Sequence, residues 1–358
     1  MKTGNNKLKM TIKAVCFTAG FLVLFYFSQR LLQGKWIEDG AENTASTSTW
    51  VEYRALEPDT VDVLFLGTSH VYSAIDPMYI YEHSGITGYA FGGPGLRFDL
   101  TYLSLKEALK TQSPKLVLLD MSAVQYAGQQ TEAKCQKIAD QLSFSLEKLE
   151  YALDPDSEEI RALNILFPLF RYHTRWEELG ENDFRYAAGT LDETVTRGHY
   201  LNYERVETAY HFYEDAGEEG RCYIEGRNLE YLERIDRLCK EEGIQLILYK
   251  LPAPTWYLEQ SEGSAAVAEK FGVPYLELFY HVDEIGLDPA TDYRDLNNHM
   301  NQNGAEKVSA YLTRYLQENY ELKDWRGKNA EWDGDLIKYK KQKASSCNLS
   351  EVCYNVPK

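Results

Sequence analysis

The chain has 358 residues, 44% of them hydrophobic and 13% aromatic, so it can bury a substantial core, and global disorder is excluded. Thirty-eight lysines and arginines stand against 55 aspartates and glutamates, which gives a formal net charge of −17. Proteins that bind nucleic acid concentrate Lys and Arg on one face and gain affinity by releasing counterions. The acidic balance therefore argues against nucleic acid as a partner.

The amino-terminal segment carries a localisation signal. Four lysines within the first thirteen residues precede an apolar run over residues 14–27, and Arg30 closes that run. From Met10 to Leu32 the segment reaches the roughly 20 residues that cross a hydrocarbon core. The basic flank predicts a cytoplasmic amino terminus and an extracytoplasmic body. Residues 1–35 are therefore predicted to form a cytoplasmic tail and a single transmembrane anchor.

Two alternatives remain for this segment. A cleaved signal peptide fits the length of the uninterrupted apolar run. Residues 28–32 are bulky or charged where a cleavage site needs small residues, which favours the uncleaved anchor. A buried core helix is the third interpretation, and the lysine-rich start makes it the weakest.

The next residues introduce the folded domain. Residues 36–60 are predicted to be a linker, because 38–49 are polar and rich in Ser, Thr, Asn and Gly. An apolar strand is expected over 61–66, and it runs directly into a Gly-x-Ser turn that ends at Ser69. Serines on such turns stand at the carboxyl end of a strand, where open α/β sheets place their chemistry.

Alternation of strands and helices continues along the chain and predicts a parallel sheet wrapped by helices. Helices are expected over 78–83, 101–111, 229–242, 265–270 and 299–316, and strands over 116–120, 245–249 and 275–278. Residues 88–91 lead into a turn signal at 92–95. The domain is predicted to span 61–320. An insertion over about 129–219 breaks the rhythm, and its aromatic and basic cluster at 167–176 could bind a sugar or form a surface helix. The last segment, 321–358, is predicted to be a surface strap or a partly ordered extension.

The cysteines are the residues that could form a metal site or a disulfide. The six cysteines are Cys16, Cys135, Cys222, Cys239, Cys347 and Cys353. None stands at zinc-site spacing, so no metal is predicted. Cys347 and Cys353 could close a small disulfide loop in an oxidising compartment, and the sequence leaves their pairing open.

A nucleophile early in the chain and an acid and base late in the chain make up the candidate site. Alone, Ser69 is more often a helix cap than a nucleophile, and a lone histidine is usually structural or solvated. Together with Asp295 and His299 on one late loop, Ser69 gains a base and the base gains a carboxylate that fixes its tautomer. This order is typical of one group of serine esterases and acyltransferases.

With these motifs the chain resembles the SGNH (GDSL-like) hydrolase superfamily, and more narrowly its membrane-anchored bacterial proteins related to polysaccharide O-acetylation and teichoic-acid D-alanylation factors. The resemblance spans about residues 50–316. It is carried by the segment 61–70, by Ala90-Phe91-Gly92, by Lys250-Leu251-Pro252 with Trp256, and by 295–301 with 304–307. The implied fold is a doubly wound, flavodoxin-like three-layer α/β sheet.

The resemblance also implies roles for individual residues. Ser69 would be the nucleophile, His299 the base and Asp295 the acid, and the amides of Ser69 and Gly92 would hold the oxyanion. His70 could line the cleft or serve in packing. Lys250 could lie near the site or in a solvated turn. No cofactor is implied.

Three departures from the family pattern bear on these roles. The family spaces its acid and base as Asp-x-x-His, whereas three residues separate Asp295 from His299, so Asp292 could be the acid instead or the loop could bulge. The third-block Gly-Asn-Asp is replaced by Asp120-Met121-Ser122, which leaves a third oxyanion donor unassigned. The first block has Gly-Thr-Ser-His in place of Gly-Asp-Ser-Leu.

The sequence therefore predicts a membrane-anchored, extracytoplasmic serine esterase or O-acyltransferase that acts on acyl esters of cell-envelope carbohydrate or polymer. The expected partners are an acyl ester or glycan substrate, the membrane through the amino-terminal helix, and a membrane-bound O-acyltransferase. The alternative is a catalytically degenerate SGNH-fold binding or assembly subunit of an acylation machinery, supported by the altered acid-base spacing.

Overall fold

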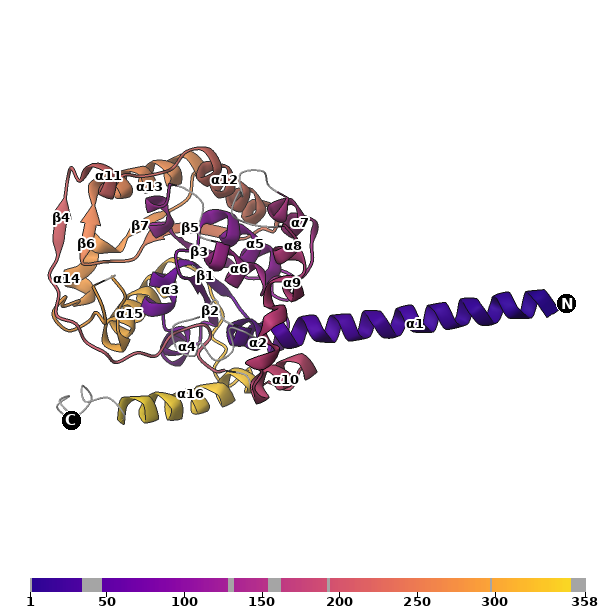
Figure 1. Ribbon diagram of the computed structural model, residues 1–358. Helices are drawn as coiled ribbons and strands as arrows, with labels where there is room; N and C mark the ends of the chain where they lie inside the picture. The colour runs from indigo at the N-terminus through magenta and orange to yellow at the C-terminus, as the bar shows by residue number, and fades with distance from the viewer. Residues whose placement is uncertain are drawn as a thin grey trace. The chain divides into compact units, whose positions relative to one another are not determined.

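The computed structural model describes residues 2–33, 47–127, 132–153, 162–191, 194–296 and 298–348 (Figure 1). The chain divides into two compact units. One holds residues 1–40 and 144–192, and the other holds residues 41–143 and 193–358. The second is the α/β unit, and the first is called the helical unit below.

A five-stranded sheet forms the centre of the α/β unit. Its strands stand in the order β2-β1-β3-β5-β7, and every neighbouring pair is parallel. The strands are β1 (Val63–Thr68), β2 (Gly88–Gly93), β3 (Leu116–Asp120), β5 (Gln245–Lys250) and β7 (Tyr275–Glu277). The prediction of an α/β fold with a parallel sheet is confirmed.

The apolar runs explain why these segments pair as central strands. Residues 63–66 are fully buried, as are Val117, Leu118 and Leu119 of β3. Parallel strands are covered on both faces, so continuous apolar runs suit them better than an apolar-polar alternation. A second, two-stranded parallel sheet pairs β4 (His211–Tyr213) with β6 (Thr255–Tyr257).

Helices of the α/β unit connect and cover the strands (Figure 1). They are α2 (Thr47–Ala55), α3 (Ser69–Ala74), α4 (Pro77–Ser84), α5 (Phe98–Ala108), η2 (Met121–Gln125), α6 (Glu132–Ala139), α11 (Gly217–Gly220), α12 (Gly226–Glu241), α13 (Leu258–Phe271), η4 (Leu278–His281), α14 (Val282–Ile285), α15 (Gln302–Asn319) and α16 (Ala330–Asn348). Two elements differ from expectation: β2 was not predicted as a strand and ends within the turn signal at 92–95, and α2 lies within the predicted linker. In α2, Trp50 and Tyr53 are buried and pack on Phe91 of β2.

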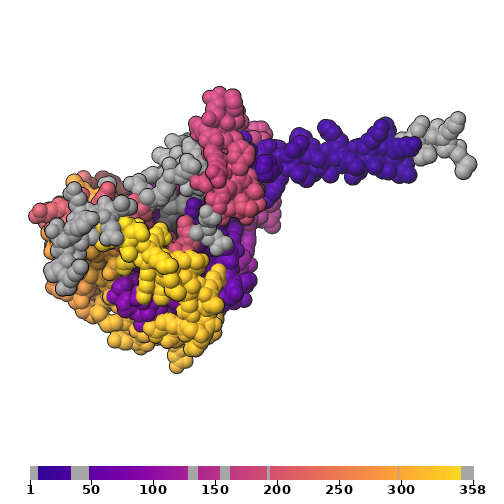
Figure 2. Space-filling view, turned by 90° about the horizontal axis from the view of Figure 1, so that it is seen from below, coloured from indigo at the N-terminus to yellow at the C-terminus, as the bar shows by residue number. Residues whose placement is uncertain are grey.

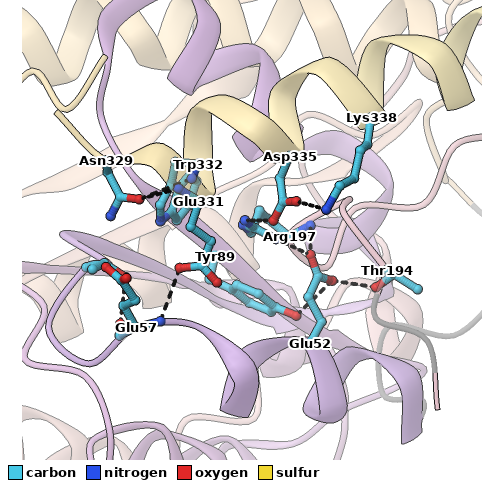
Figure 3. A network of polar contacts seen from close by, with 11 residues as sticks. Glu52, Glu57, Tyr89, Thr194, Arg197, Asn329, Glu331, Trp332, Asp335 and Lys338 are labelled. Carbon is cyan, nitrogen blue, oxygen red and sulfur yellow. Dashed lines mark hydrogen bonds and ion pairs between the residues drawn. The ribbon is translucent and has the colours of Figure 1, made fainter. Parts of the chain in front are cut away.

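The carboxyl-terminal segment is a packed helix of this unit, which lies across one of its faces (Figure 2). Trp332 and Tyr339 of α16 are almost completely buried, so two aromatic side chains anchor a segment that is poor in aliphatic residues. Figure 3 shows the buried Arg197 between the carboxylates of Glu52 and Asp335, with both ion pairs at 2.7 Å. This network joins α2, the segment before residue 200 and α16.

The helical unit contains α1 (Lys2–Gln33), α7 (Leu146–Ala152), α8 (Ala162–Leu166), α9 (Pro168–Tyr172), η3 (His173–Glu177) and α10 (Glu181–Ala188). Residues Lys7–Gln33 of α1 are long and apolar enough to cross a bilayer, with a mean hydropathy of 1.8 over the most apolar window. A membrane anchor and a signal sequence both fit this length and composition. Part of the predicted insertion thus belongs to the helical unit.

Of the two cysteines that could form a disulfide loop, Cys347 lies in the last turn of α16. Cys347 is disulfide-bonded. Cys353 lies outside the described residues, so the pairing of Cys347 with Cys353 stays a prediction. Cys16, Cys222 and Cys239 are free thiols.

Candidate active site

Ser69 stands at the carboxyl end of the central strand β1, as the first residue of α3. The turn before it is tight: Gly67 has φ +154°, and a Cβ at this position would come within 2.6 Å of the Asp120 Cβ. Thr68 caps α3, because its hydroxyl oxygen accepts a hydrogen bond from the His70 amide at 3.4 Å. The cap is therefore Thr68, and the Ser69 side chain is left to other contacts.

The Ser69 hydroxyl lies within hydrogen-bond distance of a histidine from the far end of the domain. Ser69 Oγ is 2.7 Å from His299 Nε2, and His299 Nδ1 is 2.8 Å from Asp295 Oδ2. Because Nδ1 faces a carboxylate, it carries the proton, and Nε2 accepts from the serine hydroxyl. The His299 side chain is 15% exposed and Asp295 is 32% exposed, so solvent reaches the group.

The loop that carries Asp295 and His299 is closed at its base. Tyr293 and Met300 form an antiparallel bridge, and the Arg294 amide donates to the His299 carbonyl at 2.9 Å. Asn298 takes φ +70°, a left-handed conformation that Asn tolerates. With this bend the Asp295 carboxylate reaches both the ring and the amide of His299, the amide at 3.3 Å. The three-residue spacing is therefore compatible with contact between the two side chains; Asn297 lies outside the described residues.

Asp292, the alternative acid, is engaged elsewhere. Its buried carboxylate accepts hydrogen bonds from Lys307 Nζ at 2.6 Å and from the Asp288 amide at 2.8 Å. Among the described contacts, the carboxylate on His299 is that of Asp295.

Two further side chains of the candidate site were not found by sequence reasoning. The Tyr72 ring stacks parallel to the His299 ring, with centroids 6.4 Å apart. The Arg294 guanidinium lies 3.8 Å from the Asp295 carboxylate and 4.6 Å from the centroid of the Tyr200 ring. Position 72 shares a helix face with position 69, which is the one sequence signal for it. Nothing in the sequence spacing marks the ring beneath Arg294.

His70 lies beside His299 and is held by a second polar chain. The two imidazole centroids are 5.6 Å apart. The Ser122 hydroxyl donates to Asp120 Oδ1 at 3.0 Å and is 3.1 Å from His70 Nδ1. Since the serine proton goes to Asp120, His70 Nδ1 is the donor to the Ser122 oxygen. The segment Asp120-Met121-Ser122, which stands where the family has Gly-Asn-Asp, thus supplies the two side chains that orient His70.

Asp120 is fully buried behind the Gly67 turn. Burial raises the pKa of Asp120 to about 6, and the hydrogen bonds from Ser122 and the Leu251 amide oppose that rise. The Thr68 hydroxyl donates to the same carboxylate at 3.3 Å. A carboxyl that can carry a proton near neutral pH therefore lies under the turn that presents Ser69.

Gly92 and Lys250 occupy the same edge of the sheet. Gly92 pairs with Gly67 in register, and a Cβ there would come 2.6 Å from the Thr68 carbonyl oxygen and 3.0 Å from the Tyr72 amide nitrogen. Lys250 ends β5 opposite Glu277 and is buried, which lowers its pKa, so a solvated turn is excluded. Its charged neighbours are Glu277 and Asp120. The structure brings Gly92 next to the start of α3. It places Lys250 near the buried carboxylates of Glu277 and Asp120.

No group of His, Cys, Asp and Glu side chains suited to a metal ion occurs within the described part of the chain.

Comparison with known proteins found distant structural similarity only. No protein-family model and no curated protein matches the chain. Among solved structures, a proposed acylhydrolase from Bacteroides fragilis covers 76% of this chain and 97% of its own, with 11% identity and a TM-score of 0.36. A GDSL-like lipase from Bacteroides thetaiotaomicron covers 75% and 98%, with 11% identity and a TM-score of 0.35. Scores at this level decide neither fold nor function, so the geometry of the site has to carry the proposal.

Proposed function

We propose that this protein is a serine esterase or O-acyltransferase with Ser69 as nucleophile, His299 as general base and Asp295 as the residue that orients His299. One observation carries the proposal: three side chains from two distant segments form a continuous hydrogen-bonded series, at 2.7 Å and 2.8 Å, beside a strand-to-helix turn. A histidine between a hydroxyl and a carboxylate is the arrangement that activates serine.

The reaction proceeds through an acyl-enzyme. Ser69 Oγ attacks the ester carbonyl carbon while its proton passes to His299 Nε2, and the carbonyl oxygen gains the negative charge. The amides of Ser69 and Gly92 donate hydrogen bonds to that oxyanion, each contributing about 3 kcal/mol. When the tetrahedral intermediate collapses, the alkoxide leaves with the proton from His299. Water, or a hydroxyl of an acceptor, then attacks the acyl-serine with the same proton movements.

Substrate and location follow from the family resemblance and from α1. The substrates are acyl esters of cell-envelope carbohydrate or polymer, and a membrane-bound O-acyltransferase supplies or receives the acyl group. The α1 helix serves as an uncleaved anchor, and the α/β unit lies on the extracytoplasmic side. The fold that we propose for the α/β unit is the doubly wound SGNH arrangement, with helices on both faces of the sheet. These statements are supported by the basic flank of α1 and by the motifs around Ser69 and His299.

An acyl-release assay on the full chain in detergent tests the reaction. O-acetylated glycan is supplied, and acetate release and acetyl transfer to a second, isotopically labelled glycan are both followed by mass. Ser69→Ala is compared with Ser113→Ala, which changes an exposed serine outside the candidate site. Release or transfer that Ser69→Ala abolishes and Ser113→Ala retains supports the proposal. Turnover that survives Ser69→Ala contradicts it, and no turnover on any ester favours the binding or assembly subunit.

A further inference from the structure

Exposed apolar side chains are concentrated in the helical unit. Outside α1, seven of the twelve large, exposed hydrophobic residues in the described part of the chain fall between positions 144 and 184. They are Phe144, Leu146, Leu153, Leu163, Phe170, Trp176 and Phe184, each at least half exposed. Soluble surfaces rarely concentrate apolar side chains in this way, so this group, called the apolar rim below, needs a partner.

Contacts with α1 place two members of the apolar rim, Phe170 and Trp176, near the carboxyl-terminal turns of that helix. The Phe167 ring lies 6.3 Å from Phe25 and 5.9 Å from Phe170, so Phe170 lies near the last apolar turns of α1. One turn further along α1, the side-chain oxygen of Gln29 accepts from the Leu169 amide at 2.8 Å.

The next contacts lie at the polar end of α1. Arg30 donates to the Tyr186 carbonyl at 2.8 Å, and its guanidinium lies 4.6 Å from the centroid of the Tyr186 ring. Arg175, which directly precedes Trp176, donates to the carbonyl of Leu32. At 1.5 Å per residue, positions 25 to 32 span about 10 Å of helix. This is the depth of the zone where a membrane span passes from acyl chains to water.

We propose that the apolar rim of the helical unit lies in the interfacial region of the lipid bilayer beside α1. The helical unit would then rest on the membrane surface next to the transmembrane helix. This inference rests on the proposed anchoring by α1. Aromatic side chains prefer the boundary between acyl chains and headgroups, and Arg30, which follows the apolar run of α1, stands where positive charge meets headgroup phosphates. The bilayer is the occupant because α1, which is part of the same unit, already brings it to this level.

Trp176 is a native reporter of this position. The full chain is placed in nanodiscs of phosphatidylcholine, with and without bromine atoms on the acyl chains, and tryptophan fluorescence is compared. Bromine quenches only tryptophans within contact range of the acyl chains. In a Trp36→Phe background, which removes the tryptophan that follows α1 in the sequence, we expect the quenched fraction to fall at least twofold in Trp176→Phe, whereas Trp325→Phe, in the α/β unit, leaves it unchanged. An unchanged quenched fraction in Trp176→Phe overturns the proposal.

A second variant guards against local disturbance at position 176. Phe170→Trp in the Trp176→Phe background should restore quenching, because position 170 lies closer to the apolar part of α1. If neither position is quenched while the protein stays in the nanodiscs, the anchor holds and the apolar rim is free for a protein partner instead of lipid, which overturns the proposal. Failure of the protein to enter nanodiscs overturns both the interfacial position of the apolar rim and the membrane anchoring by α1. Loss of esterase activity affects neither readout, so the Ser69 chemistry is judged separately.

Discussion

At the scale of single residues, two hydrogen-bonded series meet at the start of α3. One joins Ser69 to His299 and Asp295, and the other joins His70 to Ser122 and Asp120. Both imidazoles are oriented through Nδ1, and their rings lie 5.6 Å apart. The acid and base carry the chemistry in our account, while the second series fixes the side chain next to the nucleophile.

Replacing Asp295 by Asn should lower kcat about 10⁴-fold with a small effect on KM, because an amide no longer holds the His299 tautomer that accepts the serine proton. Steady-state kinetics on a soluble ester measure both constants. Asp283→Asn, an exposed change in α14, is the matched control and should leave kcat unaltered. Equal kcat values for the Asp295 variant and the parent protein would remove Asp295 from the mechanism.

Asp120 gives stability a pH dependence of known sign. Its pKa is about 6 in the folded protein and about 3.9 in an unfolded chain, so the folded state binds the extra proton and the contribution of Asp120 to stability is lost as pH rises from about 4 to about 6. Asp120→Asn removes this loss. Urea unfolding at several pH values should therefore show that the free energy of unfolding of the variant increases relative to that of the parent protein as pH rises through this window. Parallel plots of unfolding free energy against pH would contradict the raised pKa of Asp120.

At the scale of elements, β1, β2 and α3 approach closely at the candidate site. The glycines of β2 allow this approach, because a side chain at Gly92 would meet the backbone of Thr68 and Tyr72. The same close contact brings Gly92 next to the first turn of α3, which begins at Ser69. Sheet geometry and the proposed oxyanion site therefore depend on one small residue.

Gly92→Ala should destabilise the protein by about 1–3 kcal/mol and reduce turnover, because the two atoms nearest to the added Cβ belong to the backbone of Thr68 and Tyr72, at 2.6 and 3.0 Å. Gly334→Ala in α16 is the contrasting change: nothing lies within 4 Å of the new Cβ, and helix propensity predicts a gain of about 0.5–1 kcal/mol. Chemical denaturation reports both. A neutral Gly92→Ala variant with full turnover would show that the strand can move away.

Elements with strong local patterns could be predicted, and those that depend on distant partners could not. The strand at 116–120 is a continuous apolar run, and its bounds match β3. By contrast, β2 is rich in glycine and pairs with β1, and the buried face of α16 at 332, 335 and 339 includes an aspartate whose partner, Arg197, is distant in sequence. In the site, motif order pointed to Ser69, Asp295 and His299, whereas helical spacing from Ser69 is the one signal for Tyr72, and the place of Arg294 depends on tertiary packing.

At the scale of the whole molecule, a buried charge network closes the α/β unit. Arg197 is fully buried, pairs with Glu52 and Asp335, and lies 4.5 Å from the centroid of the Trp332 ring. Its partners come from the first and last helices of this unit. The ends of the unit are thus joined through one guanidinium.

Arg197→Met should destabilise the α/β unit by about 3–5 kcal/mol, because two carboxylates lose their buried partner. Arg221→Met, which removes a half-exposed arginine with exposed partners, should cost less than about 1 kcal/mol. Urea denaturation followed by tryptophan fluorescence measures the difference. Similar midpoints for the two variants would mean that the network contributes little.

Covalent labelling can report directly whether Ser69 is an activated nucleophile. The full-length protein is treated with a fluorophosphonate, digested, and the modified peptide is identified by mass spectrometry. We expect a single adduct on Ser69, with labelling slowed by His299→Ala and absent in Ser69→Ala. A protein that stays unlabelled, or that carries the adduct on a different serine, would contradict the account.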